Sequence, residues 1–195
     1  MEINPSQDPL LLFQDWLAAA EKTEPSNSNA MALATSTPDG RPSCRMVLLK
    51  NADHNGFTFY TNMESRKGGE LAVNPHVALC FYWRTQNRQV RVEGRVTRVA
   101  APVADAYFKT RHYLSRIGAW ASRQSQPLQS RDALAAQMKA IEARFGAEVP
   151  RPPHWSGFCV VPKTIEFWQQ GDHRLHDRFL FTREEGGWTL QRLNP

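Results

Sequence analysis

The sequence predicts a mainly β protein with peripheral helices, built around an antiparallel barrel. Many short apolar or alternating segments are separated by turn signals, such as Pro-Asp-Gly at residues 38–40. The predicted helices are few and do not alternate regularly with strands. The sequence also contains no G-x-G-x-x-G segment, which counts against a nucleotide-binding fold of the Rossmann kind. A ligand would therefore be held by side chains and helix starts.

The N-terminal half begins with a helix and continues as strands. Asp8 and Pro9 fit the N-cap and first helical position ahead of an apolar run. Strands are predicted at residues 30–35, 43–51 and 57–61, and the short turns between them favour an antiparallel meander. A short helix follows at residues 65–73.

The rest of the chain is predicted as two strands, two helices and then four strands. In the strand predicted at residues 89–99, valines alternate with charged residues, which is typical of a half-buried strand with a solvated face. Residues 148–154 form a proline-rich connector. The other predicted elements are strands at 77–83, 157–161, 165–169, 178–182 and 188–193, and helices at 102–112 and 131–145.

Length and composition indicate one soluble domain. The 195 residues suffice for a sizeable core, and the 41% hydrophobic and 22% charged fractions are those of ordinary globular proteins. A net charge of +5 favours anionic ligands. Three distant cysteines without a C-x-x-C pair indicate neither a disulfide framework nor a zinc ribbon. With no signal-peptide pattern in residues 1–7 and no membrane-length apolar run, we expect a cytoplasmic protein.

Residues 171–178 are a first candidate site. If this stretch is extended, Arg174, His176 and Arg178 line one face, while Leu175 and Asp177 turn to the other. Two guanidinium groups beside an imidazole would suit an anionic, planar ligand. A charged, solvated edge strand is an equally consistent interpretation.

Two further segments could bind phosphate. Arg66 and Lys67 follow Ser65 at a helix start, where free amides attract anions, and Tyr60 and Thr61 precede them. An exposed basic helix start is the simpler alternative there.

The second candidate phosphate site is residues 107–115, where a tyrosine, an arginine and a serine recur at a spacing of four residues. Tyr107, Arg111 and Ser115 would share one face if their helix ran that far. Arg45 and Lys50 lie five residues apart on a strand, so they point to opposite faces and need not serve the same group.

Other polar groups are weaker signals. Gln89, Gln124 and Ser125 could read the edge of a flat heterocycle, and Trp168 could pack on it, although a buried tryptophan is usually core. His173 and His176 lack the further ligands of a metal site, so no metal is expected. The absence of G-x-S-x-G leaves a covalent hydrolase unsupported.

Eight short segments of the sequence match the motifs of one protein family. They occur in the order found in that family, and together they span nearly all of residues 8–195. The sequence resembles the pyridoxine (pyridoxamine) 5′-phosphate oxidase family, which uses FMN to make pyridoxal 5′-phosphate. The strings are RMVLLK at 45–50, FYTN at 59–62, SRKGGEL at 65–71, RQVRVEG at 88–94, IGAWASRQS at 117–125, IEFWQ at 165–169, HRLHDRF at 173–179 and RLNP at 192–195.

The resemblance implies an FMN-binding split β-barrel that works as a homodimer with flavin at the subunit interface. Residues 1–195 would form a single oxidase domain, with 1–7 as a short tail and about 154–195 as the dimerisation and active-site region. The implied FMN-binding residues are Arg45, Met46, Val47, Leu48, Leu49, Lys50, Tyr60, Thr61, Arg66, Lys67, Gln89, Gln124, Ser125, Trp168 and Arg178. The implied substrate-binding residues are Lys50, Tyr107, Arg111, Ser115, Arg174, Leu175 and His176.

The implied reaction is hydride transfer from pyridoxamine or pyridoxine 5′-phosphate to FMN, with oxygen reduced to hydrogen peroxide. Arg174 and His176 are the implied catalytic residues, Arg174 as the group that positions substrate. Family members often carry an N-terminal arm with an Arg-Arg-x-Tyr segment that can cover the substrate. Nothing in residues 1–7 matches it, so we expect the lid to be absent or the chain to be shortened.

Three alternatives stay open. A relative could keep the FMN barrel but oxidise another substrate, such as a phenazine precursor. The protein could be a non-catalytic carrier of flavin or pyridoxal phosphate. A nucleic-acid-binding barrel is disfavoured, since no series of aromatic residues accompanies the arginines. We expect neither nucleic acid nor a membrane as a partner.

Overall fold

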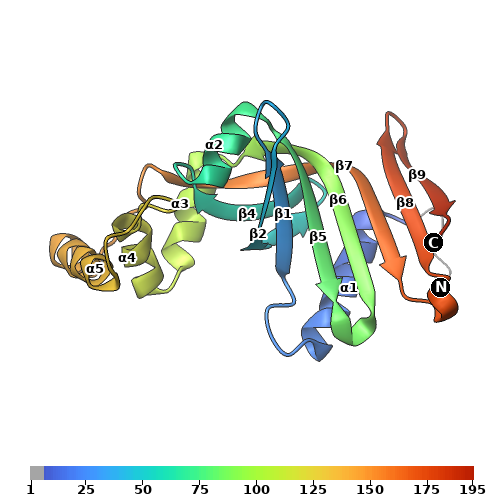
Figure 1. Cartoon of the computed structure of the whole chain (residues 1–195), viewed down its shortest axis with the longest axis horizontal. Coiled ribbons are helices and arrows are strands. Elements are labelled where there is room, and N and C mark those ends of the chain that lie inside the picture. The colour runs from blue at the N-terminus through green and yellow to red at the C-terminus, as the bar shows by residue number, and fades with distance from the viewer. Residues whose placement is uncertain (1–6) are drawn as a thin grey trace.

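The computed structural model describes residues 7–195, which form one curled antiparallel sheet with helices around it (Figure 1). The mainly β class predicted from the sequence is confirmed. Within these residues the sheet has nine strands in the order β2-β1-β5-β6-β7-β4-β3, and the β8–β9 hairpin is added to β7. The strands are β1 (Ala30–Ser36), β2 (Pro42–Leu48), β3 (Asn51–Asp53), β4 (Gly56–Asn62), β5 (His76–Trp83), β6 (Arg88–Arg98), β7 (Trp155–Gln169), β8 (Asp177–Glu184) and β9 (Gly187–Leu193). The helices are α1 (Pro9–Thr23), α2 (Arg66–Val73), α3 (Ala101–Thr110), α4 (Tyr113–Ala121) and α5 (Arg131–Phe145), with short 3-10 turns η1 (Arg84–Gln86) and η2 (Asp172–Arg174).

The first helix, α1, packs against the concave face of the curled sheet. As predicted, α1 is capped by Asp8, whose carboxylate accepts a hydrogen bond of 2.7 Å from the amide of Leu10. The ring of Phe13 is fully buried and lies 4.8 Å from Phe57 on β4 and 4.9 Å from Phe81 on β5. The N-terminal helix therefore joins strands that lie far apart in the sheet order.

The long strand β7 is the backbone of the sheet. It pairs with β4 and β6, and its C-terminal half also pairs with β8. The sequence predicted two strands here, at 157–161 and 165–169. The structure has one strand: Glu93 of β6 pairs with Thr164 and Gly94 with Pro162, so the extra residue of the bulge is Lys163 of β7.

The predicted meander of the first three strands is wrong. β1 and β2 do form a hairpin, with Ala34 opposite Cys44. The predicted third strand, β4, instead pairs with β3 and β7 at the other end of the sheet order. The predicted strand at 43–51 also divides, because Leu49 turns into the core and is only 4% exposed.

The helix predicted at residues 102–112 ends at Thr110, and the sequence analysis missed the next helix, α4. Arg111 has extended backbone angles at the break between α3 and α4. Tyr107, Arg111 and Ser115 therefore do not share one helical face. The helix predicted at 131–145 is confirmed as α5, capped by the hydroxyl of Ser130.

Across residues 7–195, no helix is long and apolar enough to cross a membrane. Of the predicted N-terminal tail, residues 1–6 lie outside the part of the chain that the structure describes.

We predict that Gly94→Ala destabilises the fold. A Cβ at Gly94 would lie 2.2 Å from the carbonyl oxygen of Val161, so the β6–β7 ladder would have to shift. The free energy of unfolding, measured by urea denaturation, should fall by roughly 1–3 kcal/mol.

Gly69→Ala is the matched control, because a Cβ there meets no atom within 4 Å. Gly69 lies on the exposed side of α2, where alanine should be neutral or stabilise by up to about 1 kcal/mol. Equal effects of the two substitutions would contradict the role given to the close approach at Gly94.

Candidate functional site

A cavity of about 760 Å³ opens between β2, β4 and the helices α3 and α4. We call it the Lys67 cavity. Its walls combine cations, hydroxyl groups, amides and aromatic rings from segments far apart in the sequence. The lining residues are Arg45, Met46, Val47, Leu48, Lys50, Tyr60, Thr61, Asn62, Lys67, Tyr107, Arg111, His112, Ser115, Gly118, Ala119, Ser122, Gln124 and Trp155.

Lys67 places a buried positive charge in this cavity. The side chain lies in the first turn of α2, and the residue is only 8% exposed. Its Nζ donates to Thr61 Oγ1 at 3.1 Å and to Gln124 Oε1 at 3.0 Å. Burial, and then the charge of Arg45, lowers the pKa of Lys67. No acidic side chain of residues 7–195 lies within 4 Å of Nζ, so the cavity has an uncompensated cation suited to an anion.

Arg111 provides a second, separate cation. Its guanidinium lies 4.8 Å from the ring centre of Trp155, and burial lowers the pKa of Arg111. Its Nη1 is buried and has no hydrogen-bond partner in the described part of the chain. A buried donor without a partner is costly, so an acceptor brought by a ligand would stabilise it.

Three stacked aromatic rings form the wall beside Arg111. The ring of Tyr60 lies 4.0 Å from Tyr107 and 5.2 Å from Trp155, with interplanar angles of 15° and 8°. Burial raises the pKa of Tyr60, so its phenol stays protonated at neutral pH. The stack holds the Tyr107 ring in the wall of the cavity that Arg111 also lines.

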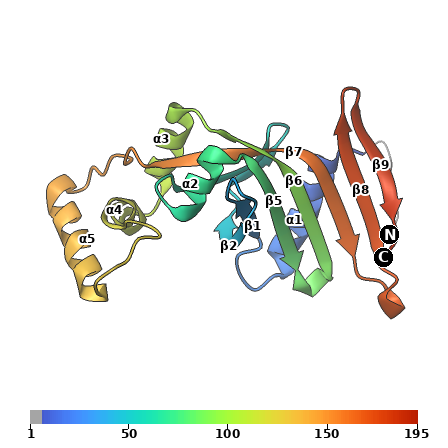
Figure 2. The ribbon, with the colours of Figure 1, turned by 45° about the horizontal axis from the view of Figure 1, so that its top comes forward.

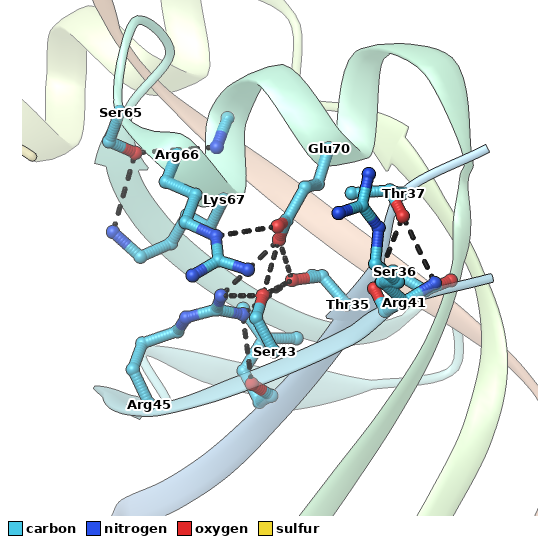
Figure 3. Close-up of polar contacts among 12 residues, drawn as sticks. Thr35, Ser36, Thr37, Arg41, Ser43, Arg45, Ser65, Arg66, Lys67 and Glu70 are labelled. Atoms are coloured by element: carbon cyan, nitrogen blue, oxygen red, sulfur yellow. Dashed lines mark hydrogen bonds and ion pairs between the residues drawn. The ribbon is translucent and has the colours of Figure 1, made fainter. Parts of the chain in front are cut away.

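Behind the cavity, a buried carboxylate collects four donors (Figure 3). Glu70 is 6% exposed and accepts from Thr35, Ser43, Arg45 and Arg66. Burial alone would raise the pKa of Glu70, but the hydrogen bonds from Ser43, Thr35 and Arg66 lower it to about 2. Glu70 is thus a carboxylate at any physiological pH.

A second set of predicted residues gathers on another part of the sheet. We call Gln89, Trp168, His176 and Arg178 the Trp168 group. Gln89 lies opposite Trp168, and Trp168 opposite Arg178, across β6, β7 and β8. The ring of His176 lies 4.7 Å from that of Trp168. Arg178 Nε donates to the buried Glu166 at 2.8 Å, and Arg91 donates to the same carboxylate.

The extended conformation considered for residues 171–178 is not found before Asp177, where β8 begins. Asp172 to Arg174 form the 3-10 turn η2, with positive φ angles of 53° at His173 and 66° at Arg174. Gly171 permits the turn, since a Cβ there would lie 2.1 Å from the carbonyl oxygen of Leu175. The amide of Gly171 donates to His176 Nδ1 at 3.2 Å. Arg174, His176 and Arg178 therefore do not line one face of a strand.

The structure divides the predicted site residues between two places. Strand β7 begins at the cavity with Trp155 and ends near the Trp168 group, and the two views place α3 and α4 far from β8 (Figures 1 and 2). Arg174 and Leu175 are exposed on the turn beside the Trp168 group, where Leu175 is 70% exposed. The cavity holds Arg45, Met46, Val47, Leu48, Lys50, Tyr60, Thr61, Lys67, Tyr107, Arg111, Ser115 and Gln124.

Three predicted residues lie in neither place. Leu49 is in the core, Arg66 lies over Glu70, and Ser125 lines a neighbouring cavity together with Gln124. The sequence analysis missed Trp155, which follows the proline-rich connector and carried no local signal. It also missed Glu70, although its i, i+4 spacing from Arg66 on a predicted helix could have indicated the pair.

Both parts of the chain match sequence families. Residues 17–145 match the family described as pyridoxamine 5′-phosphate oxidase, and residues 155–195 match the pyridoxine 5′-phosphate oxidase C-terminal dimerisation region. The chain belongs to the pyridoxamine 5′-phosphate oxidase family. The family predicted from the sequence is confirmed.

Relatives within the family match over nearly the whole chain. The pyridoxine/pyridoxamine 5′-phosphate oxidase of Sphingopyxis alaskensis is 60% identical over 191 residues, covering 97% of this chain and 88% of that one. The enzyme of the same name from Rhodospirillum rubrum is 59% identical over 195 residues, covering 97% of each chain.

Solved structures show the same fold. PhzG from Burkholderia lata, in complex with tetrahydrophenazine-1-carboxylic acid, is 33% identical with a TM-score of 0.93, covering 98% of this chain and 95% of that one. A pyridoxamine 5′-phosphate oxidase-related protein from Nostoc punctiforme has a TM-score of 0.76 at 17% identity, covering all of both chains. The split-barrel fold expected from the resemblance is confirmed.

We predict that Glu70 makes stability depend on pH below neutrality. Because the pKa of Glu70 falls from its ordinary 4.5 to about 2 on folding, its stabilisation is complete above pH 4.5 and is lost between pH 4.5 and 2. This pH-dependent part is on the order of 3 kcal/mol. The difference in free energy of unfolding between wild type and Glu70→Gln should therefore shrink as pH falls through this range.

Urea denaturation of both proteins, at neutral pH and in steps below pH 4.5, measures that difference. A difference that stays constant over the range would contradict an ionised Glu70 with a depressed pKa.

Proposed function

We propose that this chain oxidises pyridoxamine 5′-phosphate and pyridoxine 5′-phosphate to pyridoxal 5′-phosphate, with FMN as cofactor and oxygen as electron acceptor. The observation that carries this proposal is the presence of two separate cations in one cavity, the buried Lys67 and the half-buried Arg111. Lys67 has no acidic partner in residues 7–195, and Arg111 Nη1 has no partner there at all. FMN and the substrate each bring one phosphate. The full-length similarity to enzymes of this name supports the same assignment.

The residues around Lys67 fit the phosphate of FMN. A phosphate carries up to two negative charges and several acceptor oxygens, so it needs clustered donors and cations. Lys67, the hydroxyl of Thr61 and the amide of Gln124 already contact one another there, with Arg45 beside them. The adjacent wall is apolar, since Met46 and Leu48 line the cavity and are 63% and 40% exposed. A planar flavin ring could pack against these side chains.

The residues around Arg111 fit the phosphate of the substrate. The break between α3 and α4 leaves Arg111 in the cavity wall between Tyr107 and Ser115, and Lys50 lines the same cavity. These are the residues that the resemblance assigns to the substrate phosphate. They gather there through tertiary structure, since they do not share one helix.

The chemistry that FMN supplies when bound is acceptance of a hydride from the substrate's amine- or alcohol-bearing carbon, followed by reduction of oxygen to hydrogen peroxide. The chain's own residues hold and orient the two molecules, and no side chain acts as a nucleophile. In this proposal Arg174 positions the substrate and stabilises the charge that develops on the substrate. His176 would lie beside the substrate ring.

A homodimer would complete the site. Trp168 is thirteen residues along β7 from Trp155, a span of roughly 40 Å in an extended strand. We propose that the Trp168 group of one subunit meets the Lys67 cavity of the other, with FMN between them. The match of residues 155–195 to a dimerisation region supports this arrangement.

The sheet face that such a partner would cover is exposed and partly apolar. Met46 lies opposite Ala32, and Ala32 lies opposite Cys80, in one row across β2, β1 and β5. The next row on the same face contains Tyr82, opposite Gln89 of the Trp168 group. Tyr82 is 57% exposed, and an apolar aromatic surface next to a site is typical of an interface.

A second candidate is oxidation of a phenazine precursor. It is favoured by the TM-score of 0.93 with PhzG, whose structure contains tetrahydrophenazine-1-carboxylic acid. Against it, a carboxylate brings two acceptor oxygens and one negative charge, whereas Lys50, Tyr107, Arg111 and Ser115 in one cavity suit the larger charge and the further oxygens of a phosphate. The greater identity to the pyridoxine/pyridoxamine 5′-phosphate oxidases also favours the first proposal.

An absorbance spectrum, recorded before and after anaerobic addition of pyridoxamine 5′-phosphate, tests the proposal. We expect a flavin spectrum that bleaches with substrate and returns with air, while pyridoxal 5′-phosphate forms. A flavin that stays oxidised with both phosphorylated vitamers but bleaches with a dihydrophenazine acid would favour the second candidate. A flavin that no substrate bleaches would indicate a carrier.

A further inference from the structure

Glu70 is a buried carboxylate that does not line the Lys67 cavity, yet it contacts Arg45, which does, and Arg66 (Figure 3). Its Oε1 accepts from Arg66 Nε at 2.9 Å. Its Oε2 accepts from Thr35 at 2.5 Å, Ser43 at 2.6 Å and Arg45 Nη2 at 3.3 Å. A buried charge with this many donors is held in one orientation.

The two hydroxyl groups transmit this orientation to Arg45. A hydroxyl has one proton, so Thr35 and Ser43, which donate to Glu70, must present lone pairs to any other partner. Arg45 uses those lone pairs, through Nη1 to Thr35 at 2.5 Å and Nη2 to Ser43 at 2.5 Å. Nη1 also donates to the carbonyl of Leu33 at 3.1 Å. Both terminal nitrogens of Arg45 are thus held, and Nε–H is left for a ligand.

Arg66 makes fewer contacts with Glu70 and its neighbours than Arg45 does, so more of its N–H groups are left for a ligand. It contacts Glu70 only through Nε, one turn along α2, and its side chain is 63% exposed. Its two terminal amino groups have no partner among residues 7–195. They lie at the start of α2 beside Lys67, where the helix amides also favour an anion.

We propose that Glu70 is a positioning residue that holds Arg45 and Arg66 so that their remaining N–H groups, together with Lys67, bind the phosphate of FMN. This inference rests on the proposed function, because it takes FMN as the ligand of the Lys67 cavity. A purely structural Glu70 would instead tie α2 to the β1–β2 hairpin and would affect every ligand of the cavity equally.

Glu70→Gln separates these roles. Glutamine has nearly the same shape, but its amide group offers one acceptor oxygen and must donate from nitrogen. The Thr35 and Ser43 hydroxyls, or Arg66, then lose their acceptor, and the arginines are no longer held in place. The measurement is the dissociation constant of FMN and of riboflavin for the flavin-free, full-length protein, by quenching of flavin fluorescence. Riboflavin has the same ring without the phosphate.

We expect Glu70→Gln to weaken FMN binding about tenfold, as for loss of a hydrogen bond to a charged group, and to leave riboflavin binding unchanged. Ser43→Ala should change the FMN-to-riboflavin affinity ratio in the same direction by a smaller factor, since it removes one hydroxyl and keeps the charge. Glu64→Gln is the control, because Glu64 is exposed, lies outside the cavity lining and undergoes the same change of charge. It should alter neither affinity.

The inference is overturned if Glu70→Gln binds FMN as wild type does, or loses FMN and riboflavin by the same factor. If Glu70→Gln does not fold, Ser43→Ala decides, and an unchanged affinity ratio in that variant overturns the inference. A wild-type protein that binds neither flavin would refute the proposed function itself. Wild-type FMN binding with an unaffected Glu70→Gln would refute only the role of Glu70.

Discussion

The pairing of β7 with its neighbours is the constraint on which the rest of the structure depends. This strand runs through the sheet from the Lys67 cavity to the Trp168 group and pairs with β4, β6 and β8. Its ladder with β6 covers eleven residue pairs, with one register shift beside Gly94. A ladder of this length is stiff, so it keeps the Lys67 cavity and the Trp168 group of one chain apart. The proposal that a second copy completes the site rests on this separation.

Buried carboxylates hold the arginines in both groups. Glu70 contacts Arg45 and Arg66, and Glu166 contacts Arg91 and Arg178. Burial alone would raise the pKa of Glu166, but its bonds to Arg178 and Arg91 more than offset this and lower it. A guanidinium held in this way loses little further side-chain entropy when a phosphate arrives, which favours binding. Lys67 and Arg111 lack such partners, and they are the cations that a ligand would neutralise.

Local signals in the sequence were sufficient to predict most of the helices and strands. Asp8 caps α1 as its position predicted, and the structure adds Ser65 and Ser130 as the caps of α2 and α5. The resemblance named most of the residues that line the cavity. Spacing could not reveal that Tyr107 and Ser115 belong to different helices, because the break depends on the extended backbone at Arg111.

The pairing of strands that lie far apart in the chain could not be predicted from local sequence patterns either. β4 lies beside β7, about a hundred residues later in the chain, rather than beside β2. The turn at residues 172–174 depends on two left-handed residues, His173 and Arg174, and non-glycine residues adopt this conformation only when their surroundings impose it. The hydrogen bond from Gly171 to His176, which closes this turn, was not predicted by any sequence pattern either.

The central claim, that each site is built from two copies of the chain, can be tested with mixed dimers. Lys67→Ala damages the cavity, and Arg174→Ala damages the turn beside the Trp168 group. When the two variants are co-expressed, random pairing gives about half mixed dimers, each with one intact site, so about a quarter of wild-type oxidase activity should return. Each variant alone should be inactive yet dimeric. Activity no higher than the sum of the separate variants, in verified mixed dimers, would contradict the shared site and place it within one chain.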